Sequence, residues 1–593
     1  MKLKKYVSFL LMLILLASAL IACKDTQSDT DASEQSVATE EDILLTIASN
    51  GESEYTIWYA SGMALSYDVI KQIDTIKSTL KSKTGAELAV KKDNLYNAQA
   101  DADKPAILIG DTVFEESKAM AEKRLKLGDY YVGSSGNKII IYSNTDGGYI
   151  NAIRYFVNKV ISTQSDENKT VYFTDEHIIT NKVTYGIDSI KCAGVELCDF
   201  NIVISRNADI NESMFAKELR QYLVEQYGYE LQIVKDSISE AENEILIGKA
   251  RTTADGPSEK YGISEENGKL RFFADGMLGY NSLLEYVKNT LWKSSKSASY
   301  TLDSGYSFVT DISLSLNDAT VLSNQKYGDI RCMFYNVYGY EEDAGPMSLR
   351  QSMQAEIIDT YAPDVVAFQE YAPAYHLSFT AKMTELGYTQ VKVSLGTIAK
   401  NNWTPLFYNA EKLDVVDKGY YLYSGTNNEN SKSVTWAVFK DKTTGEQALV
   451  MGTHFMWNQP GVSNPNALRT QNATELVAKI NEIKASYSGI PIVIGGDLNC
   501  IMNSDPTKVL TGAGLSHAWE RAEVKNNSSG HHGYSTYDAG KEIYTAYFEP
   551  TGTTPYIDHV YVQNVTVKAF ATATDKYSLI CSDHSPVIVD ISI

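Results

Sequence analysis

Residues 491–499 read Pro-Ile-Val-Ile-Gly-Gly-Asp-Leu-Asn, an apolar run that ends in two polar side chains. Such a short apolar run is typical of a buried β-strand. A carboxylate at the end of a buried strand is costly unless it is paired or binds a metal ion. Asp497 and Asn499 alternate along an extended chain, so both side chains can face one pocket. This stretch therefore indicates a functional site at the end of a strand.

The same pattern recurs on both sides of this stretch. From residue 330 onward, strand-like apolar runs alternate with helix-like segments, and each run meets a polar residue at one end. The polar residues outside the first stretch are Asn336, Glu370, His454, Asp558, Asp583 and His584. One such residue is weak support, but the repetition predicts an α/β domain whose active site lies at strand ends.

In this order, the motifs resemble those of the endonuclease/exonuclease/phosphatase superfamily. The resemblance covers essentially all of residues 327–593. It implies a four-layer α/β sandwich, in which two mixed β-sheets are flanked by helices. It also implies a metal-dependent phosphoric ester hydrolase that cleaves phosphodiester bonds.

The resemblance implies a metal site at three of these residues. Glu370 is the leading ligand, Asn336 lies nearby, and Asp583 completes the shell. Mg²⁺ is the expected cofactor, with Mn²⁺ as an alternative, because hard cations take oxygen ligands and often only one or two carboxylates.

The other site residues are expected to carry the proton transfers and to hold the phosphate. His584 is the expected general base, since a histidine near its ordinary pKa can accept a proton at neutral pH. Asp558 would hold its tautomer. Asp497 and Asn499 would orient the water and bind a phosphate oxygen. His454 would contact the phosphate or protonate the leaving group.

The N-terminus predicts export and a lipid anchor. Lys2, Lys4 and Lys5 precede a short apolar segment, which is typical of a signal peptide. Leu-Ile-Ala-Cys, ending at Cys23, resembles the lipobox of bacterial lipoproteins. That resemblance implies cleavage before Cys23 and diacylation of its thiol. We therefore expect an extracytoplasmic protein that is anchored to the bacterial cell membrane.

Residues 42–310 contain a degenerate duplication. Ile107-Leu108-Ile109-Gly110 matches Ile245-Leu246-Ile247-Gly248, and an amphipathic segment that ends in glycine precedes each. The repeated order of strand, helix, strand, strand and helix predicts two small α/β modules. They resemble the accessory domain of β-hexosaminidases and α-glucuronidases. Both a spacer role and glycan contact are compatible with this pattern.

These patterns predict six segments. They are a signal peptide (1–22), a flexible tether (23–41), module 1 (42–185), module 2 (186–310), a linker (311–326) and the catalytic domain (327–593).

The substrate is less well defined by the sequence. The formal net charge of −21 gives no attraction for a polyanion, and we find no glutamate to partner His454 as in deoxyribonucleases. We still favour nucleic acid, ahead of a phospholipid, as in phospholipase C and sphingomyelinases, or a small organic phosphate. A non-catalytic glycan-binding surface protein is the competing class. Cys192 and Cys198 are close enough in sequence to pair.

Overall fold

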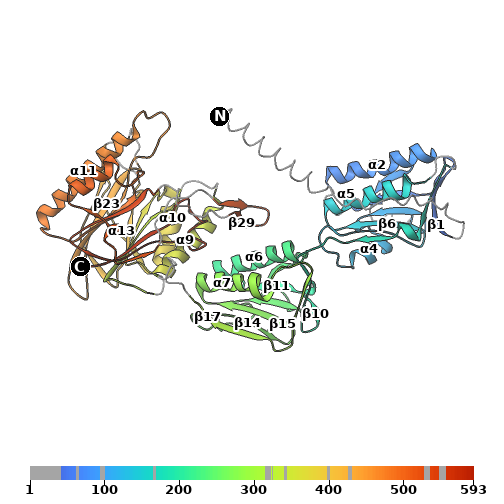
Figure 1. Cartoon of the computed structure of the whole chain (residues 1–593), viewed down its shortest axis with the longest axis horizontal. Helices are drawn as coiled ribbons and strands as arrows, with labels where there is room; N and C mark the ends of the chain where they lie inside the picture. Colours follow the sequence, from blue (N-terminus) through green and yellow to red (C-terminus); the bar gives the residue numbers. More distant parts are fainter. Residues whose placement is uncertain are drawn as a thin grey trace. The chain divides into compact units, whose positions relative to one another are not determined.

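The computed structural model describes most of the chain from Asp42 onward. The described residues are 42–61, 66–93, 101–164, 169–254, 256–313, 322, 325–339, 344–396, 401–424, 426, 431–526, 535–546 and 556–593. They form two compact units, Met1–Lys182 and Val183–Ile593 (Figure 1). The predicted signal peptide, tether and Cys23 lie outside the described residues. Among the described helices, none is long and apolar enough to cross a membrane.

The first unit is built on a mixed sheet in the order β3-β2-β4-β6-β5-β8. The strands of the whole unit are β1 (Ile43–Ser49), β2 (Thr56–Tyr59), β3 (Ala89–Lys92), β4 (Ala106–Ile109), β5 (Tyr130–Ser135), β6 (Lys138–Ser143), β7 (Thr170–Thr174) and β8 (Ile179–Asn181). Its helices are α2 (Tyr67–Thr84), α4 (Glu115–Ala121) and α5 (Asp146–Tyr155). Helix α2 ends at Gly85, whose φ of 84° confirms the predicted glycine cap.

Module 2 opens the second unit and has a sheet of the same plan, in the order β12-β11-β13-β15-β14-β17. Its strands are β9 (Ile187–Cys192), β10 (Val195–Glu196), β11 (Asn201–Ile204), β12 (Ile233–Lys235), β13 (Glu244–Ile247), β14 (Lys260–Glu266), β15 (Lys269–Ala274), β16 (Ala298–Leu302) and β17 (Ser307–Asp311). Its helices are α6 (Ile210–Gln226) and α7 (Gly276–Tyr286). Cys192 and Cys198 are not joined by a disulfide bond.

The catalytic domain contains two larger sheets. The first has the order β20-β21-β19-β18-β32-β31-β27 and the second β22-β23-β24-β25-β30-β26. The strands of the first are β18 (Ile330–Asn336), β19 (Val365–Gln369), β20 (Tyr388–Gln390), β21 (Leu406–Asn409), β27 (Val524–Asn526), β31 (Thr566–Thr572) and β32 (Val587–Ser592). Those of the second are β22 (Leu413–Leu422), β23 (Ser433–Asp441), β24 (Gln447–His454), β25 (Ile492–Asp497), β26 (Ser516–His517) and β30 (Asp558–Gln563). A separate hairpin pairs β28 (Thr536–Asp538) with β29 (Ile543–Ala546).

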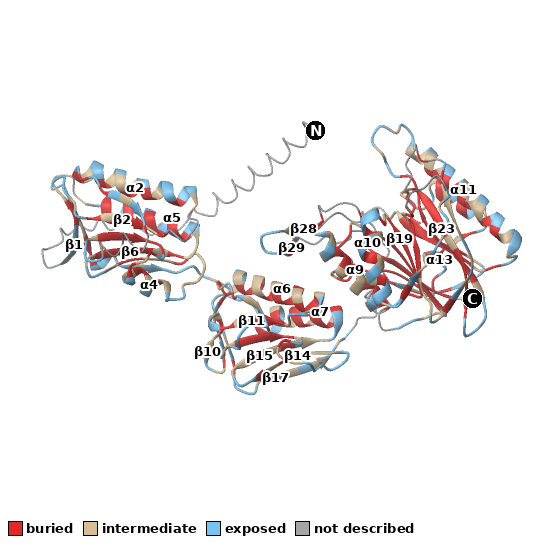
Figure 2. Ribbon diagram, turned by 180° about the vertical axis from the view of Figure 1, so that it is seen from behind, coloured by how far each residue is buried: buried red, intermediate tan, exposed pale blue. Residues whose placement is uncertain are grey.

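In the described part of this domain, the helices are α9 (Met347–Tyr361), α10 (Pro373–Glu385), α11 (Pro465–Ser486), α12 (Asp505–Gly512) and α13 (Ala518–Arg521). Side chains alternate across each strand, so each sheet buries both faces (Figure 2). Phe334 and Val493 pack between the sheets, whereas Tyr335 faces α9 and Ile494 faces α11. The predicted four-layer α/β sandwich is thereby confirmed.

Strand pairing brings the predicted polar residues together. His454 pairs with Asp497 in the parallel ladder of β24 and β25, and Asp497 pairs with Asp558 in the antiparallel ladder of β25 and β30. In the other sheet, Asn336 pairs with Gln369, next to Glu370. Because the two sheets pack face to face, the polar strand ends meet at one edge of the sandwich.

Candidate active site

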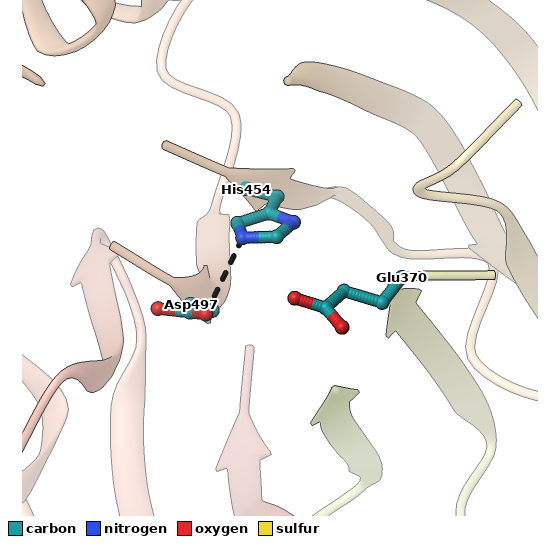
Figure 3. Close-up of side chains that lie close together, drawn as sticks. All are labelled: Glu370, His454 and Asp497. Carbon is teal, nitrogen blue, oxygen red and sulfur yellow. Dashed lines mark ion pairs between the residues drawn. The ribbon is translucent and has the colours of Figure 1, made fainter. Parts of the chain in front are cut away.

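Glu370, His454 and Asp497 form the centre of this group. Each stands at or directly after the end of a strand, and their side chains converge (Figure 3). One ligand-type atom from each lies within 4.8 Å of the other two. His454 Nε2 is 3.3 Å from Asp497 Oδ2. All three side chains are therefore close enough to act on one substrate group.

Backbone geometry at two positions makes this convergence possible. Gly496 has a φ of 139°, and a Cβ there would lie 2.0 Å from the carbonyl oxygen of Thr453. Only glycine allows β24 and β25 to come so close just before Asp497. Glu370 has a φ of 56°, which is rare for a residue with a side chain. Such strained residues cluster at functional sites, where the surrounding structure holds them.

His584 and Asp558 form the second part of the site. His584 Nδ1 lies 2.8 Å from Asp558 Oδ2, and His584 Nε2 lies 3.8 Å from Asp497 Oδ2. Burial alone would lower the pKa of His584, but the carboxylates of Asp558 and Asp583 outweigh it and hold that pKa well above its usual value. Asp558 thus orients the ring and stabilises its charged form, while Nε2 faces the centre of the site.

Asp497 is held by hydrogen bonds from several sides. Asn336 Nδ2 donates to Asp497 Oδ2 at 3.2 Å, and the backbone N–H of Asn499 donates to Oδ1 at 2.8 Å. Burial would raise the pKa of Asp497, but the neighbouring His454, His584 and Lys432 outweigh it and lower that pKa. Asp497 is therefore a fixed negative charge.

Lys432 is a site residue that sequence reasoning missed. Its Nζ lies 2.8 Å from His454 Nε2 and 3.3 Å from Nδ1, and the residue is only 4% exposed. Burial and the Lys432 ammonium lower the pKa of His454. The only sequence signal is that Lys432 directly precedes an apolar strand run, which is too common to mark a site.

The residues present fit a divalent cation. Glu370 Oε2 and Asp583 Oδ1 are buried, and neither has a hydrogen-bond partner among the described residues. Two such oxygens are costly unless a positive group compensates them, and carboxylates suit Mg²⁺ or Mn²⁺. Asn336 Oδ1 accepts from the N–H of Tyr338 at 3.1 Å. The assignment of Glu370, Asn336 and Asp583 as ligands stays a prediction.

All eight site residues predicted between 327 and 593 are described, and they lie in one group at the edge of the sandwich. Asn499 also contacts His454, because its Nδ2 lies 3.2 Å from His454 Nε2. Their individual roles as base, orienting acid and phosphate contacts stay predictions.

Comparison with known proteins identifies this domain. Residues 333–584 match the model of the endonuclease/exonuclease/phosphatase family. This stretch is a domain of that family, and the protein is a hydrolase of phosphoric esters. A search of curated proteins finds no match.

Several solved structures are similar to this chain. An endonuclease/exonuclease/phosphatase from Bacteroides vulgatus is 21% identical, with a TM-score of 0.35, over 44% of this chain and 98% of that one. A mannosyl-6-phosphatase from Bacteroides thetaiotaomicron is 18% identical, with a TM-score of 0.35, over 45% and 100%. D. rerio TDP2 with a single-strand DNA product is 16% identical, with a TM-score of 0.32, over 44% and 99%.

Proposed function

We propose that the protein hydrolyses phosphodiester bonds with a divalent cation, Mg²⁺ or Mn²⁺, as cofactor. The observation that carries this proposal is the convergence of Glu370, His454 and Asp497, with the pair of His584 and Asp558 next to Asp497. Hydrolysis needs a base for the water, positive charge on the phosphate and help for the leaving oxygen. The residues of this site offer all three.

The protein's own side chains would divide this chemistry. The carboxylates of Asp558 and Asp583 hold the pKa of His584 above its usual value, so the ring must first lose its proton to act as a base. A cation bound at Asp583 would offset that carboxylate and lower the pKa, and His584 Nε2 would then take the proton of the attacking water while Asp558 holds the ring. Asp497 and Asn499 would orient that water and a phosphate oxygen. Glu370, Asn336 and Asp583 would hold the cation, which, when bound, would neutralise the phosphate and polarise its P–O bonds.

Lys432 and His454 would bind the phosphate on the side away from His584. The ammonium donates toward His454 Nε2, so His454 is a neutral hydrogen-bonding group next to a fixed positive charge. A buried ammonium is a strong partner for a phosphate oxygen. Lys432 and His454 would contact only the phosphate group and not the alcohol that is esterified to it. This contact therefore supports phosphoesterase activity in general.

Among substrates, we favour nucleic acid over a phospholipid or a small organic phosphate. Trp457 follows His454 by three residues and is 41% exposed. Such a ring offers a surface on which a base can stack, and a lipid chain or another apolar group would also fit it.

The test is hydrolysis by the soluble chain without signal peptide and tether, residues 41–593, with Mg²⁺ against DNA, RNA, sphingomyelin and inositol phosphates. We expect release of product from at least one class and a fall of about 10²- to 10⁴-fold in His584→Ala. His177→Ala, a histidine in the first unit, is the matched control. No hydrolysis of any phosphoester, or equal rates in wild type and His584→Ala, would overturn the proposal.

We also propose that Cys23 anchors the protein to the outer face of the bacterial cell membrane. The support is the signal-peptide pattern and the lipobox-like sequence before Cys23. Two acyl chains anchor a protein stably, whereas one is marginal. In a bacterial host, the wild type should be in the membrane fraction and Cys23→Ser in the medium or soluble fraction. Equal distribution of both would contradict the anchor.

Glycan contact by module 2 is a second proposal. A cavity of about 620 Å³ lies where its parallel strands end, lined by Asp209, Glu212, Arg271 and Tyr280 among others. The acidic and guanidinium groups around this cavity can hydrogen-bond to sugar hydroxyls, and the aromatic ring can pack against the face of a sugar ring. Binding of residues 42–593 to a glycan array should be lost in Arg271→Ala. A failure to bind any glycan would leave module 2 without this role.

A further inference from the structure

Module 2 and the catalytic domain share one hydrophobic core within the second compact unit. Met214 of α6 and Met277 of α7 are buried in the same cluster as Ile357 of α9 and as Tyr577 and Cys581, which precede the catalytic His584. A spacer needs no such contact, because modules that move independently meet through small polar surfaces.

Buried polar contacts join the same surfaces. Tyr577 Oη donates to Asn211 Oδ1 of α6 at 3.0 Å. The neighbouring Lys576 forms a largely buried ion pair with Glu218, also on α6. Glu356 of α9 accepts from the N–H of Met277 at 3.1 Å. Without α6, the Tyr577 hydroxyl and the Lys576 ammonium would be left without these partners, which is costly for buried groups.

The turn that carries Lys576 and Tyr577 leads directly into the active site. The N–H of Cys581 donates to the carbonyl of Tyr577 at 3.0 Å, and the carbonyl of Cys581 accepts from Gln354 Nε2 at 3.1 Å. Ser582 Oγ then donates to the carbonyl of Asn336 at 2.7 Å. Asp583 and His584 follow at once, so the position of this turn decides where their side chains lie.

We propose that module 2 is a brace for the active site: α6 holds the turn at residues 575–581 and thereby positions Asp583 and His584. Asn211, Glu218, Lys576 and Tyr577 are positioning residues in this arrangement. The activity readout below rests on the proposed phosphoesterase function, whereas the exchange readout does not.

The experiment uses the soluble chain, residues 41–593, and a double-mutant cycle of Glu218→Gln and Lys576→Met. We expect Glu218→Gln to lower kcat roughly 10- to 100-fold with little change in KM, because a misplaced catalytic group loses rate more than binding. In the Lys576→Met background, Glu218→Gln should have little further effect. Amide hydrogen exchange of the peptide 573–584 should be faster in Glu218→Gln than in wild type.

Glu244→Gln is the matched control. Glu244 is a buried acid of module 2 that pairs with Arg251 at 2.6 Å and does not contact the turn. It should leave both kcat and exchange of 573–584 unchanged while the protein stays folded. Tyr577→Phe is a smaller change for use if Glu218→Gln fails to fold, and it should act in the same direction.

The proposed positioning role of module 2 would be overturned if Glu218→Gln and Glu244→Gln changed kcat and the amide exchange of residues 573–584 equally. It would also be overturned if neither variant changed them. If the wild type hydrolyses no phosphoester, the proposed function fails, and the exchange of 573–584 alone then decides the brace.

Discussion

At the scale of single residues, the site depends on buried charges that compensate one another. His584 lies among the carboxylates of Asp558, Asp583 and Asp497, and Lys432 lies against His454. A buried charge that loses its partner is strongly unfavourable. Each of these side chains is therefore constrained by its neighbours before any substrate arrives.

Lys432→Met should lower kcat/KM by roughly 10- to 100-fold, because a charge-assisted contact to phosphate contributes about 1.5–3 kcal/mol. The measurement is hydrolysis of whichever phosphoester the wild type cleaves, at saturating Mg²⁺. Lys440→Met, at an exposed position near the end of β23, the strand that Lys432 directly precedes, should leave the rate unchanged. Equal rates for Lys432→Met and wild type would remove Lys432 from the site.

At the scale of elements, the register of β24, β25 and β30 places the active-site residues. The close approach at Gly496 lets β25 run up to Asp497 beside His454. In the ladder of β25 and β30, Gly496 pairs with His559, which faces away from Asp558. His559 hydrogen-bonds His517 at 3.1 Å and the carbonyl of Cys500 at 2.7 Å. Both faces of β30 are thus occupied by buried polar groups.

Gly496→Ala should destabilise the protein by roughly 2–4 kcal/mol, because its Cβ would collide with the carbonyl of Thr453 and its φ is unfavourable for alanine. Urea unfolding followed by fluorescence would measure this loss. Gly512→Ala is the control, since no atom lies within 4 Å of its Cβ position at the end of α12. A change below ~0.5 kcal/mol in Gly496→Ala would contradict the geometry described here.

The buried pair of His517 and His559 should make stability depend on pH. Burial lowers the pKa of His517 to about 3 and that of His559 to about 4, whereas an unfolded histidine has a pKa of ~6.5. From about pH 6.5 down to about pH 4, unfolding therefore takes up protons, and stability falls as the pH falls.

The expected slope is about 1.4 kcal/mol per pH unit for each histidine. Urea unfolding at pH 7, 6 and 5 would measure it. The double variant His517→Gln/His559→Gln should lose this part of the slope, even though its stability at pH 7 is lower. An unchanged slope in the double variant would show that other groups cause the acid sensitivity.

At the scale of the whole molecule, the second unit is one folding body that contains both module 2 and the catalytic domain. Its active site holds two buried carboxylate oxygens, Glu370 Oε2 and Asp583 Oδ1, that have no hydrogen-bond partner in the part of the chain that the structure describes. These oxygens oppose folding unless a cation binds there. If a cation binds there, as we propose, the stability of the unit would rise with cation concentration.

Adding Mg²⁺ or Mn²⁺ should raise the unfolding temperature. At a cation concentration a hundred times the Kd, the free energy of unfolding should increase by about 2.7 kcal/mol. Glu370→Gln should abolish the increase in stability on adding the cation. In the presence of EDTA, this variant should be at least as stable as wild type, because it removes a buried charge. Thermal unfolding with and without EDTA would test both statements. A cation response that persists in Glu370→Gln would place the binding site elsewhere.

The eight polar residues of the catalytic domain could be found in the sequence because each interrupts an apolar run, a local pattern. Lys432 could not, because it meets His454 only through the antiparallel pairing of β23 with β24. The brace also could not, because Tyr577 and Asn211 are 366 residues apart. No local periodicity records a contact of that kind.

The sequence by itself determined the layers of the catalytic domain and the set of polar strand ends, since burial and side-chain alternation act over a few residues. It also predicted that Asp497 and Asn499 face one pocket, and both lie beside His454. The predicted extended chain is wrong, because the strand ends at Asp497 and Asn499 has a φ of 52°, so a turn brings the two side chains together. Only the tertiary structure decided how these strand ends meet, that a lysine stands beside His454, and that module 2 packs beneath the His584 turn. Those contacts depend on strand register and on packing between elements that are far apart in the sequence. Local sequence patterns do not record contacts of this kind.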